Sequence, residues 1–371
     1  MSRKEVAIVS LLKPVNDVRS YEKMARSLAS EGFCVTLIGS NNSKNILKPK
    51  EENISFQSLP HFKPLSLERF LMPWIVFREL SKLKPELAIV NTSELLIVVL
   101  LNQILFGGKI VYDIQENYFR NFIYQNNYPP ILKHLLGFSV RLKEKLLSPF
   151  IDHFILAEHG YIDEFSFFRS KYTVIENKAV TMNQRETSSK GSKCFKFLFS
   201  GNISDNSGVK RALDFFKAIA KEIPEIKLTI IGHCPNERFL NKLKEKCTED
   251  IELIASIHPI DHTTILKQIQ DSDFGIVSYN VNPSNENCMP TKVFEYLAYG
   301  LPIISQTRTK WTEYALKHKA CISVEYENFN TNIVAASIMN FDKSSMNHHG
   351  KFTWDIESKK LIELIGPYLN K

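Results

Sequence analysis

The sequence lacks the features that mark several protein classes. Its six cysteines include no CxxC pair, and a chain of 371 residues can build its core without disulfides. The longest apolar stretch, residues 95–106, is interrupted by Asn102 and Gln103 and is too short to span a bilayer. No small-residue cleavage site follows the short apolar segment near the amino terminus, so we expect no signal peptide. These absences together favour free thiols and a cytoplasmic location.

The charge balance is moderate. The chain has 47 basic and 40 acidic residues, which gives a formal net charge of +7. This surplus is too small to predict binding to nucleic acid, but it is compatible with anionic ligands or an anionic membrane surface. Hydrophobic residues make up 44% of the chain and charged residues 23%, which is typical of a globular protein, and the length favours two domains.

Short apolar runs alternate with helical segments in both halves of the chain. Strands are predicted at residues 5–12, 33–38, 86–91, 109–112, 153–156, 196–200, 227–231, 274–278 and 302–305. Helices are predicted at residues 20–30, 208–223 and 356–369. This alternation predicts an α/β protein with two Rossmann-like, doubly wound parallel-sheet domains that face a ligand cleft.

A polar segment rich in serine and threonine, residues 180–194, is predicted to be the linker between the two domains. It separates a domain at residues 1–179 from a second domain at residues 195–350. The remaining residues, 351–371, carry a helix that can fold back on either domain, and a return to the N-terminal domain is one of these two options.

Two basic amphipathic segments leave a choice open. Residues 59–84 and 128–150 each carry three more cations than anions, together with several large apolar side chains. Such segments can lie on anionic lipid. The alternative is a pair of ordinary surface helices whose apolar faces pack on the sheet.

The most informative segment is residues 287–305, NCMPTKVFEYLAYGLPIIS. Pro290 fits the first position of a short helix, and Gly300 fits its end. Met289 is a poor cap, so the first turn exposes the backbone N–H groups of Thr291 and Lys292. Free N–H donors and the positive end of the helix dipole suit a diphosphate.

Two charged side chains belong to the same predicted helix. Lys292 would add a mobile positive charge at its amino end, and Glu295 lies one turn further on the same face. A carboxylate in this place can accept two hydrogen bonds from a ribose diol. The alternative is a plain surface helix with a Lys/Glu pair.

This segment resembles the donor-binding signature of GT-B fold glycosyltransferases, specifically the retaining family-4-like group (glycosyl transferases group 1). A variant of that signature, P-x-K-x-F-E-Y-x-x-x-G-x-P, is matched by Pro290, Lys292, Phe294, Glu295, Tyr296, Gly300 and Pro302. Further segments resemble the family in the same order, at residues 17–39, 86–96, 109–118, 174–180, 197–216 and 227–233. The resemblance therefore covers nearly the whole chain.

The resemblance implies an enzyme that transfers a sugar from a nucleotide-diphosphate sugar, with retained anomeric configuration and without a metal or cofactor. It places the acceptor in the N-terminal domain and the donor in the C-terminal domain. The implied donor-binding residues are Gly201, Asn202, Gly232, Asn287, Pro290, Thr291, Lys292 and Glu295. The implied acceptor-binding residues are Asp17, Arg19, Glu94 and Asn117.

The sequence departs from the family pattern at several positions. Asn287 stands where the motif has its first carboxylate, and Asn202 and Ser207 stand near the usual Arg and Lys that hold the diphosphate. The positive charge must then come from Lys292, or from Lys210 and Arg211.

A histidine of the family is also replaced, by Gln115. A retaining transfer depends on stabilising the departing diphosphate and on positioning the acceptor hydroxyl, so no strong base is required. The predicted catalytic residues are Lys292 for the diphosphate and Glu116 with Gln115 for the hydroxyl. Glu116 could equally be a solvated loop carboxylate.

We therefore expect a cytoplasmic glycosyltransferase that extends a glycan or lipid-linked glycan of a surface polysaccharide, such as lipopolysaccharide or capsule, with peripheral contact to the inner membrane face. Two alternatives remain: a nucleotide-sugar epimerase on the same fold, and a non-catalytic scaffold protein. Asp271 and Asp273 precede a buried run and are expected to be turn and cap residues rather than metal ligands.

Overall fold

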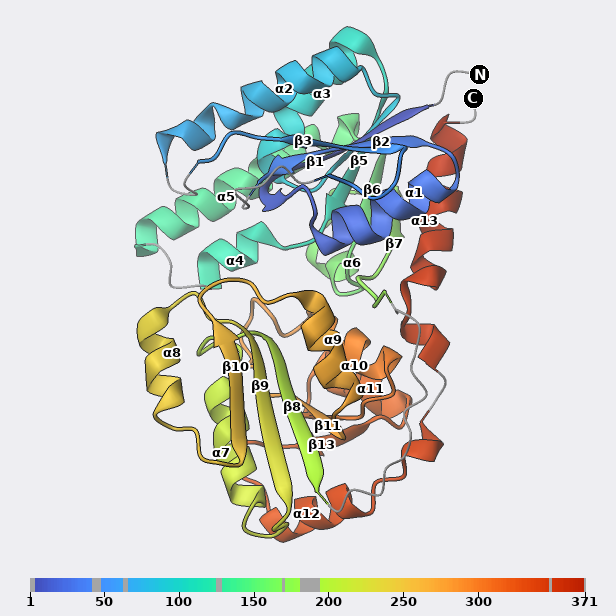
Figure 1. Cartoon of the computed structure of the whole chain (residues 1–371). Helices are drawn as coiled ribbons and strands as arrows, with labels where there is room; N and C mark the ends of the chain where they lie inside the picture. Colours follow the sequence, from blue (N-terminus) through green and yellow to red (C-terminus); the bar gives the residue numbers. More distant parts are fainter. Residues whose placement is uncertain are drawn as a thin grey trace. The chain divides into compact units, whose positions relative to one another are not determined.

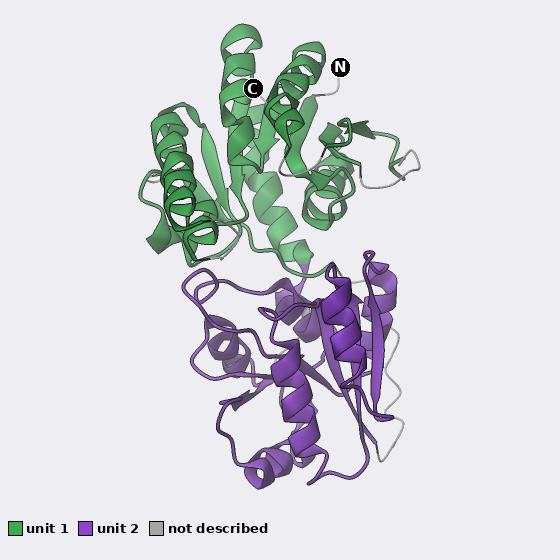
Figure 2. Cartoon of the chain, turned by 90° about the vertical axis from the view of Figure 1, so that its left-hand side faces the viewer, with its two compact units in different colours: residues 1–180, 354–371 green, residues 181–353 purple. Residues whose placement is uncertain are grey.

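The computed structural model describes residues 4–41, 48–62, 66–124, 129–168, 171–180, 194–346 and 349–369. The chain forms two compact units (Figure 2). Unit 1 combines Met1–Val180 with Trp354–Lys371, and unit 2 is Thr181–Thr353. All but the two ends of the predicted linker, residues 180–194, lie outside the described residues.

Unit 1 is built on a seven-stranded parallel sheet (Figure 1). The strand order is β3-β2-β1-β4-β5-β6-β7. The bounds are β1 Glu5–Pro14, β2 Cys34–Ser40, β3 Ile54–Ser58, β4 Leu87–Val90, β5 Lys109–Ile114, β6 His153–Leu156 and β7 Tyr172–Val174. The sequence missed β3 and β7, because these two edge strands are short and have few buried residues.

Helices cover both faces of this sheet. On one face lie α2 (Met72–Leu83), α3 (Leu96–Phe106) and α5 (Pro130–Leu147), which share an apolar core with β1, β4, β5 and β6. Around them are the short elements η2 (Leu67–Phe70), η3 (Ser93–Leu95), α4 (Tyr118–Tyr124), η4 (Ser148–Phe150) and α6 (Tyr161–Glu164). None of the helices within the described ranges combines the length and the apolar character needed to traverse a bilayer.

The other face is covered by segments from both ends of the chain. The helix predicted at residues 20–30 is a π-helix, η1 (Val18–Ala25), continued by α1 (Arg26–Ser30). Beside it lies the C-terminal helix α13 (Trp354–Leu369) (Figure 1). Trp354 donates from its indole Nε1 to Ser27 Oγ at 2.9 Å, and Leu361 and Ile365 are buried in the same apolar core. The last helix of the chain is thus part of unit 1.

Unit 2 is a six-stranded parallel sheet in the order β10-β9-β8-β11-β12-β13. Its strands are β8 Phe195–Asn202, β9 Ile226–His233, β10 Ile251–Ser256, β11 Phe274–Val277, β12 Ile303–Gln306 and β13 Cys321–Val324. Its helices are α7 Val209–Ile219, α8 Glu237–Lys244, α9 His262–Gln270, α10 Thr291–Ala298, α11 Lys310–Lys317 and α12 Thr331–Met339, followed by the turns η5 Lys343–Ser345 and η6 His349–Phe352. Two parallel sheets with helices confirm the predicted α/β class. The two outer strands, β10 and β13, were not predicted.

Candidate donor site in unit 2

The topology of unit 2 marks one place for a ligand. Strands β8 and β11 are neighbours at the centre of the sheet. The next strands in sequence follow on opposite sides, β9 and β10 beside β8, and β12 and β13 beside β11. After β8 the chain continues through α7 to β9, and after β11 it continues through α10 to β12. The loops at the carboxyl ends of the two strands therefore diverge, and ligands of open α/β sheets bind at such a switch point.

Helix α10 begins at this point, and among the residues that the structure describes no side chain caps its amino end. Pro290 is the residue before the helix, with φ −60° and ψ 130°, rather than its first helical residue as predicted. Gly300 ends the helix as predicted, with a positive φ of 71°. The N–H groups of Thr291 and Lys292 in the first turn have no capping side chain, so they remain available to an anion.

Lys292 is the most unusual residue of the site. Its side chain is only 5% exposed, and its Nζ has no hydrogen-bond partner within the part of the chain that the structure describes. The Nζ lies 4.3 Å from the ring centre of Phe199 and 4.8 Å from that of Tyr279. Burial lowers the pKa of Lys292 to about 7, although the nearby Glu295 carboxylate acts in the opposite direction. The expectation that Lys292 carries a mobile positive charge at the helix start is therefore wrong, because its amine is buried.

Two glycines bring the strand ends and Lys292 together. A Cβ added to Gly232 at the end of β9 would lie 1.7 Å from the carbonyl oxygen of Gly201 in β8. Only glycine permits this approach of the two strands. A Cβ added to Gly201 would in turn lie 3.6 Å from Cε of Lys292. The predicted donor residues Gly201, Gly232 and Lys292 thus form one cluster at the carboxyl edge of the sheet.

Glu295 lies one turn into α10 and has a partner that the sequence did not suggest. Its Oε1 accepts a hydrogen bond from Nε2 of His262 at 2.8 Å, and His262 is the first residue of α9. The two residues are far apart in the sequence, and no spacing rule connects them. Only the packing of α9 beside α10 could have revealed the pair.

The two other predicted cations are already paired. Lys210 forms an ion pair with Asp205 at 2.8 Å. Arg211 pairs with Glu327 and also donates to the carbonyl oxygen of Tyr279 at 3.1 Å. The positive charge that remains for a diphosphate is therefore that of Lys292.

The remaining donor candidates lie at the rim of this cluster. Asn202 is exposed at the last position of β8, and Asn287 is half-buried in the turn before α10. Ser207, which stands near a missing family cation, is buried and exchanges hydrogen bonds with Ser204. The structure thus leaves Asn202 and Asn287 accessible, whereas Ser207 maintains the loop after β8.

Two acceptor candidates of unit 1 are buried in structural contacts. Arg19 is 3% exposed and forms a bidentate ion pair with Asp113, at 2.7 and 3.0 Å. Asn117 is also buried and donates to Glu164 at 2.6 Å, while its Oδ1 accepts from Arg141. Their burial argues against direct contact with an acceptor and indicates that they hold the loops in place.

The other unit 1 candidates are more accessible. Glu116 is exposed and accepts a hydrogen bond from Asn121 at 3.0 Å. Gln115 interacts with Asp113 and Lys13, and Glu94 is ion-paired with Arg69. Asp17 caps η1 by accepting a hydrogen bond from the N–H of Ser20 at 3.1 Å.

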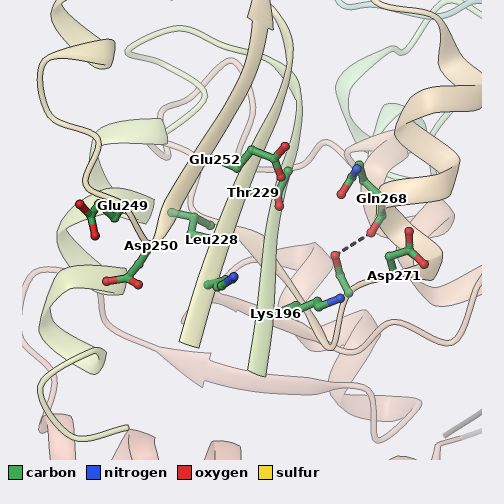
Figure 3. A pocket seen from close by; sticks show the side chains of 10 residues that line it. Lys196, Leu228, Thr229, Glu249, Asp250, Glu252, Gln268 and Asp271 are labelled. Atoms are coloured by element: carbon green, nitrogen blue, oxygen red, sulfur yellow. Dashed lines mark hydrogen bonds between the residues drawn. The ribbon is translucent and has the colours of Figure 1, made fainter. Parts of the chain in front are cut away.

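A separate polar cavity lies at the opposite edge of the unit 2 sheet (Figure 3). It has a volume of about 420 Å³ and is lined by Lys196 and Lys227 near the amino ends of β8 and β9, and by Glu252 of β10. The adjacent Asp273 accepts from the N–H of Lys196 at 3.0 Å and from Lys343 at 3.1 Å. This cavity is remote from Gly201 and α10, and Asp273 acts as a cap, as the sequence predicted.

Comparisons with known proteins agree with this geometry. The family model of glycosyl transferases group 1 matches residues 194–339, which include β8, Lys292 and Glu295. Sucrose-phosphate synthase from Thermosynechococcus elongatus has a TM-score of 0.71 at 14% identity, covering 98% of this chain and 99% of its own. Anabaena Alr3699/HepE in complex with UDP-glucose has a TM-score of 0.66 at 13% identity. The match covers 98% of this chain and 99% of the Anabaena chain. A proposed UDP-N-acetylglucosamine 2-epimerase from Listeria monocytogenes has a TM-score of 0.62 at 12% identity. The match covers 100% of this chain and 97% of the Listeria chain.

A comparison of the sequence with curated proteins gave no match. The structural neighbours show the GT-B fold, and residues 194–339 match the family model of glycosyl transferases group 1. The resemblance found in the sequence is thereby confirmed, and so is the expectation of a glycosyltransferase enzyme. The retaining, family-4-like character and the roles of single residues stay predictions.

Proposed function

We propose that this protein transfers a sugar from a nucleotide-diphosphate sugar to a hydroxyl of a glycan or lipid-linked glycan, with retention and without a metal ion. The observation that carries the proposal is the buried, unpaired Nζ of Lys292 beside Gly201 and the uncapped start of α10. A buried amine without a counter-ion is costly unless a ligand supplies the opposite charge. The Anabaena neighbour, whose structure contains UDP-glucose, supports a donor of this class.

The diphosphate would meet two kinds of positive group at the switch point. The N–H groups of Thr291 and Lys292 belong to the first turn of α10, and the Lys292 amine lies beside Gly201 at the end of β8. Phosphate charge raises the pKa of a neighbouring amine, so donor binding would drive Lys292 to its protonated form. The ammonium then stabilises the charge that develops on the departing phosphate oxygen as the glycosidic bond of the donor breaks. The acceptor oxygen forms the new bond to the anomeric carbon, its proton passes to the departing phosphate oxygen, and the nucleoside diphosphate leaves.

The nucleoside would be held one turn further along α10. Glu295 accepts from His262 through Oε1, which leaves Oε2 to accept from a ribose hydroxyl. Because His262 fixes the orientation of the carboxylate, the two residues would act together on the pentose. Glu116, which is exposed in the loop after β5, is our proposal for orienting the acceptor hydroxyl.

We further propose a role in the synthesis of a surface polysaccharide, such as lipopolysaccharide or capsule, at the cytoplasmic face of a membrane. The apolar and basic segments of unit 1, residues 59–84 and 128–150, support this acceptor class.

A panel of nucleotide sugars tests the proposal. The enzyme is incubated with each sugar, and both released nucleoside diphosphate and isomerised sugar are measured. A transferase gives slow diphosphate release that an acceptor accelerates. Isomerisation without release would instead establish the epimerase, and binding without turnover would establish the scaffold protein.

A further inference from the structure

Helix α5 exposes a continuous apolar stripe to solvent. Its exposed side chains recur every three or four residues, at Ile131, Leu135, Phe138, Leu142 and Leu146. This spacing keeps them on one side of the helix. The opposite side holds the buried Gly137 and Glu144. The stripe therefore lies away from the buried side of α5, although Phe138 also packs edge-to-face on Phe119 of α4, with ring centres 5.4 Å apart.

Neighbouring helices on the same side of the sheet also expose apolar side chains. Helices α2 and α3 lie side by side (Figure 1), and η3 contacts both α2 and α5. Exposed large apolar side chains on η2, α2 and α3 are Leu67, Phe70, Leu71, Trp74, Ile97, Ile104, Leu105 and Phe106. Together with the stripe on α5 they form what we call the apolar face. Exposed apolar clusters of this kind mark interaction sites.

The exposed charges that α5 itself carries beside the stripe have one sign. Glu144 is the single carboxylate of α5, and it is buried and accepts from the hydroxyl of Tyr112 at 2.9 Å. His134 and Lys145 flank the stripe on one side, and Lys143 flanks it on the other. The ion pairs formed by described residues do not include Lys145. On α5 itself the described residues beside the stripe are therefore apolar or cationic. Elsewhere on the apolar face Glu68 of η2 is exposed, and Glu94 of η3 is ion-paired with Arg69.

This charge distribution distinguishes between two binding partners for the apolar face, a second copy of the chain and a lipid bilayer. A second copy of the chain in a twofold dimer would place the same cations against each other. An anionic bilayer supplies the opposite charge and also accepts the apolar side chains. We propose that the apolar face docks on the surface of an anionic lipid bilayer, with α5 lying in the interface. This inference adds a docking surface to the proposed function. It rests on the proposed function only in assuming a lipid-linked acceptor.

Vesicle sedimentation tests the docking. The full chain is mixed with vesicles of equal parts phosphatidylglycerol and phosphatidylcholine, or with phosphatidylcholine alone. We expect the protein to sediment with the anionic vesicles and to remain largely in solution with the neutral ones. The double variant Leu135→Glu with Leu142→Glu should lose at least about tenfold in vesicle affinity. Lys145→Gln should lose about fivefold in affinity for anionic vesicles and should bind neutral vesicles like the unchanged protein.

A matched control comes from α12 of unit 2. Ile333 is 66% exposed and Leu135 is 65% exposed, so Ile333→Glu with Met339→Glu introduces the same charge on an equally open helix. This control should bind anionic vesicles like the unchanged protein. Circular dichroism checks that each variant is folded.

Three results would overturn the inference. One is equal binding to neutral and anionic vesicles, another is equal loss in the α5 and α12 variants, and the third is no binding at all. A halved molecular mass of the α5 variant without lipid would show that a second copy covers the face. Glu295→Gln separates the two proposals, because it should reduce nucleotide binding while vesicle binding stays unchanged.

Discussion

The two units each contain a buried cation, and the surroundings of the two cations differ. In unit 1, Arg19 is 3% exposed and bound to both carboxylate oxygens of Asp113. Burial acts to lower the pKa of Arg19, but the attraction of Asp113 outweighs it and the pKa is raised. In unit 2, Lys292 is 5% exposed, and its Nζ has no hydrogen-bond partner among the described residues. Its burial lowers its pKa to about 7.

This difference separates a structural charge from a functional one. A buried cation whose carboxylate is part of the same fold stabilises that fold only as a pair. A buried amine without a carboxylate costs stability, and such a cost is commonly tolerated at a site that binds or transforms a ligand. The comparison therefore assigns Arg19 to the architecture of unit 1 and supports Lys292 as a ligand-binding group of unit 2.

The largest effect is expected when the Arg19 pair is broken. Arg19→Met leaves the Asp113 carboxylate buried without its partner, and the free energy of unfolding should fall by about 3–5 kcal/mol. Urea unfolding measures the loss. Arg26→Met is the control, because its 2.7 Å ion pairs with Glu22 and Glu51 lie at the surface and should each contribute less than about 1 kcal/mol. A similar small loss for both variants would refute a structural role of Arg19.

The next largest effect concerns turnover. Lys292→Met should lower the rate of sugar transfer by about 10²–10³-fold, because the departing phosphate loses its buried ammonium. Donor affinity should fall less than the rate, as measured by calorimetry with the nucleoside diphosphate. Lys210→Met is the matched control, since Lys210 is already paired with Asp205. Equal activity of the two variants would show that another cation serves the diphosphate.

A smaller effect is expected at the ribose site. Glu295→Gln replaces a charged acceptor by a neutral one, and nucleotide affinity should weaken by about 10-fold. The fold should be unchanged, as judged by thermal unfolding. Glu313→Gln, an exposed residue of α11, serves as the control. Unchanged affinity of Glu295→Gln would remove Glu295 from the nucleotide site.

The last effect, about as large per pH unit as the change at the ribose site, is a pH dependence of stability. Because the pKa of Lys292 is lower in the folded protein than the usual 10.5, the unfolded chain binds the proton more readily. The cost of burying Lys292 is thus fully present below about pH 7 and disappears as the pH rises toward the unfolded value. Lys292→Met should therefore be more stable than the unchanged protein near pH 7, with a gain that shrinks by up to about 1.4 kcal/mol per pH unit at higher pH. A gain that is constant with pH would contradict the lowered pKa.

The sequence predicted the inner strands of both sheets because their side chains are buried on both faces. Residues 153–156, for example, were predicted with the bounds that β6 has, and residues 109–112 lie within β5. The edge strands β3, β7, β10 and β13 escaped prediction. Their exposed faces carry polar residues, so no continuous apolar run distinguishes them from loops.

The candidate site shows the same division. The segment from Pro290 to Gly300 was predicted from local rules, because caps and helix ends depend on neighbouring residues. The burial of Lys292 and the contact of Glu295 with His262 were not predicted. Both depend on side chains from other elements, and no periodicity within one segment records them.

The amino-acid sequence by itself determined two alternating α/β regions and a short helix whose bare amino end follows a buried strand. Local propensities and buried apolar runs are sufficient for these features, because each depends on residues close together in the chain. The tertiary structure decided that the amine of this helix lies against Phe199 and Tyr279 instead of in water. It also brought the last helix of the chain into unit 1, through contacts such as that of Trp354 with Ser27. Both outcomes follow from long-range packing, which minimises exposed apolar surface over the whole fold and not within any one segment.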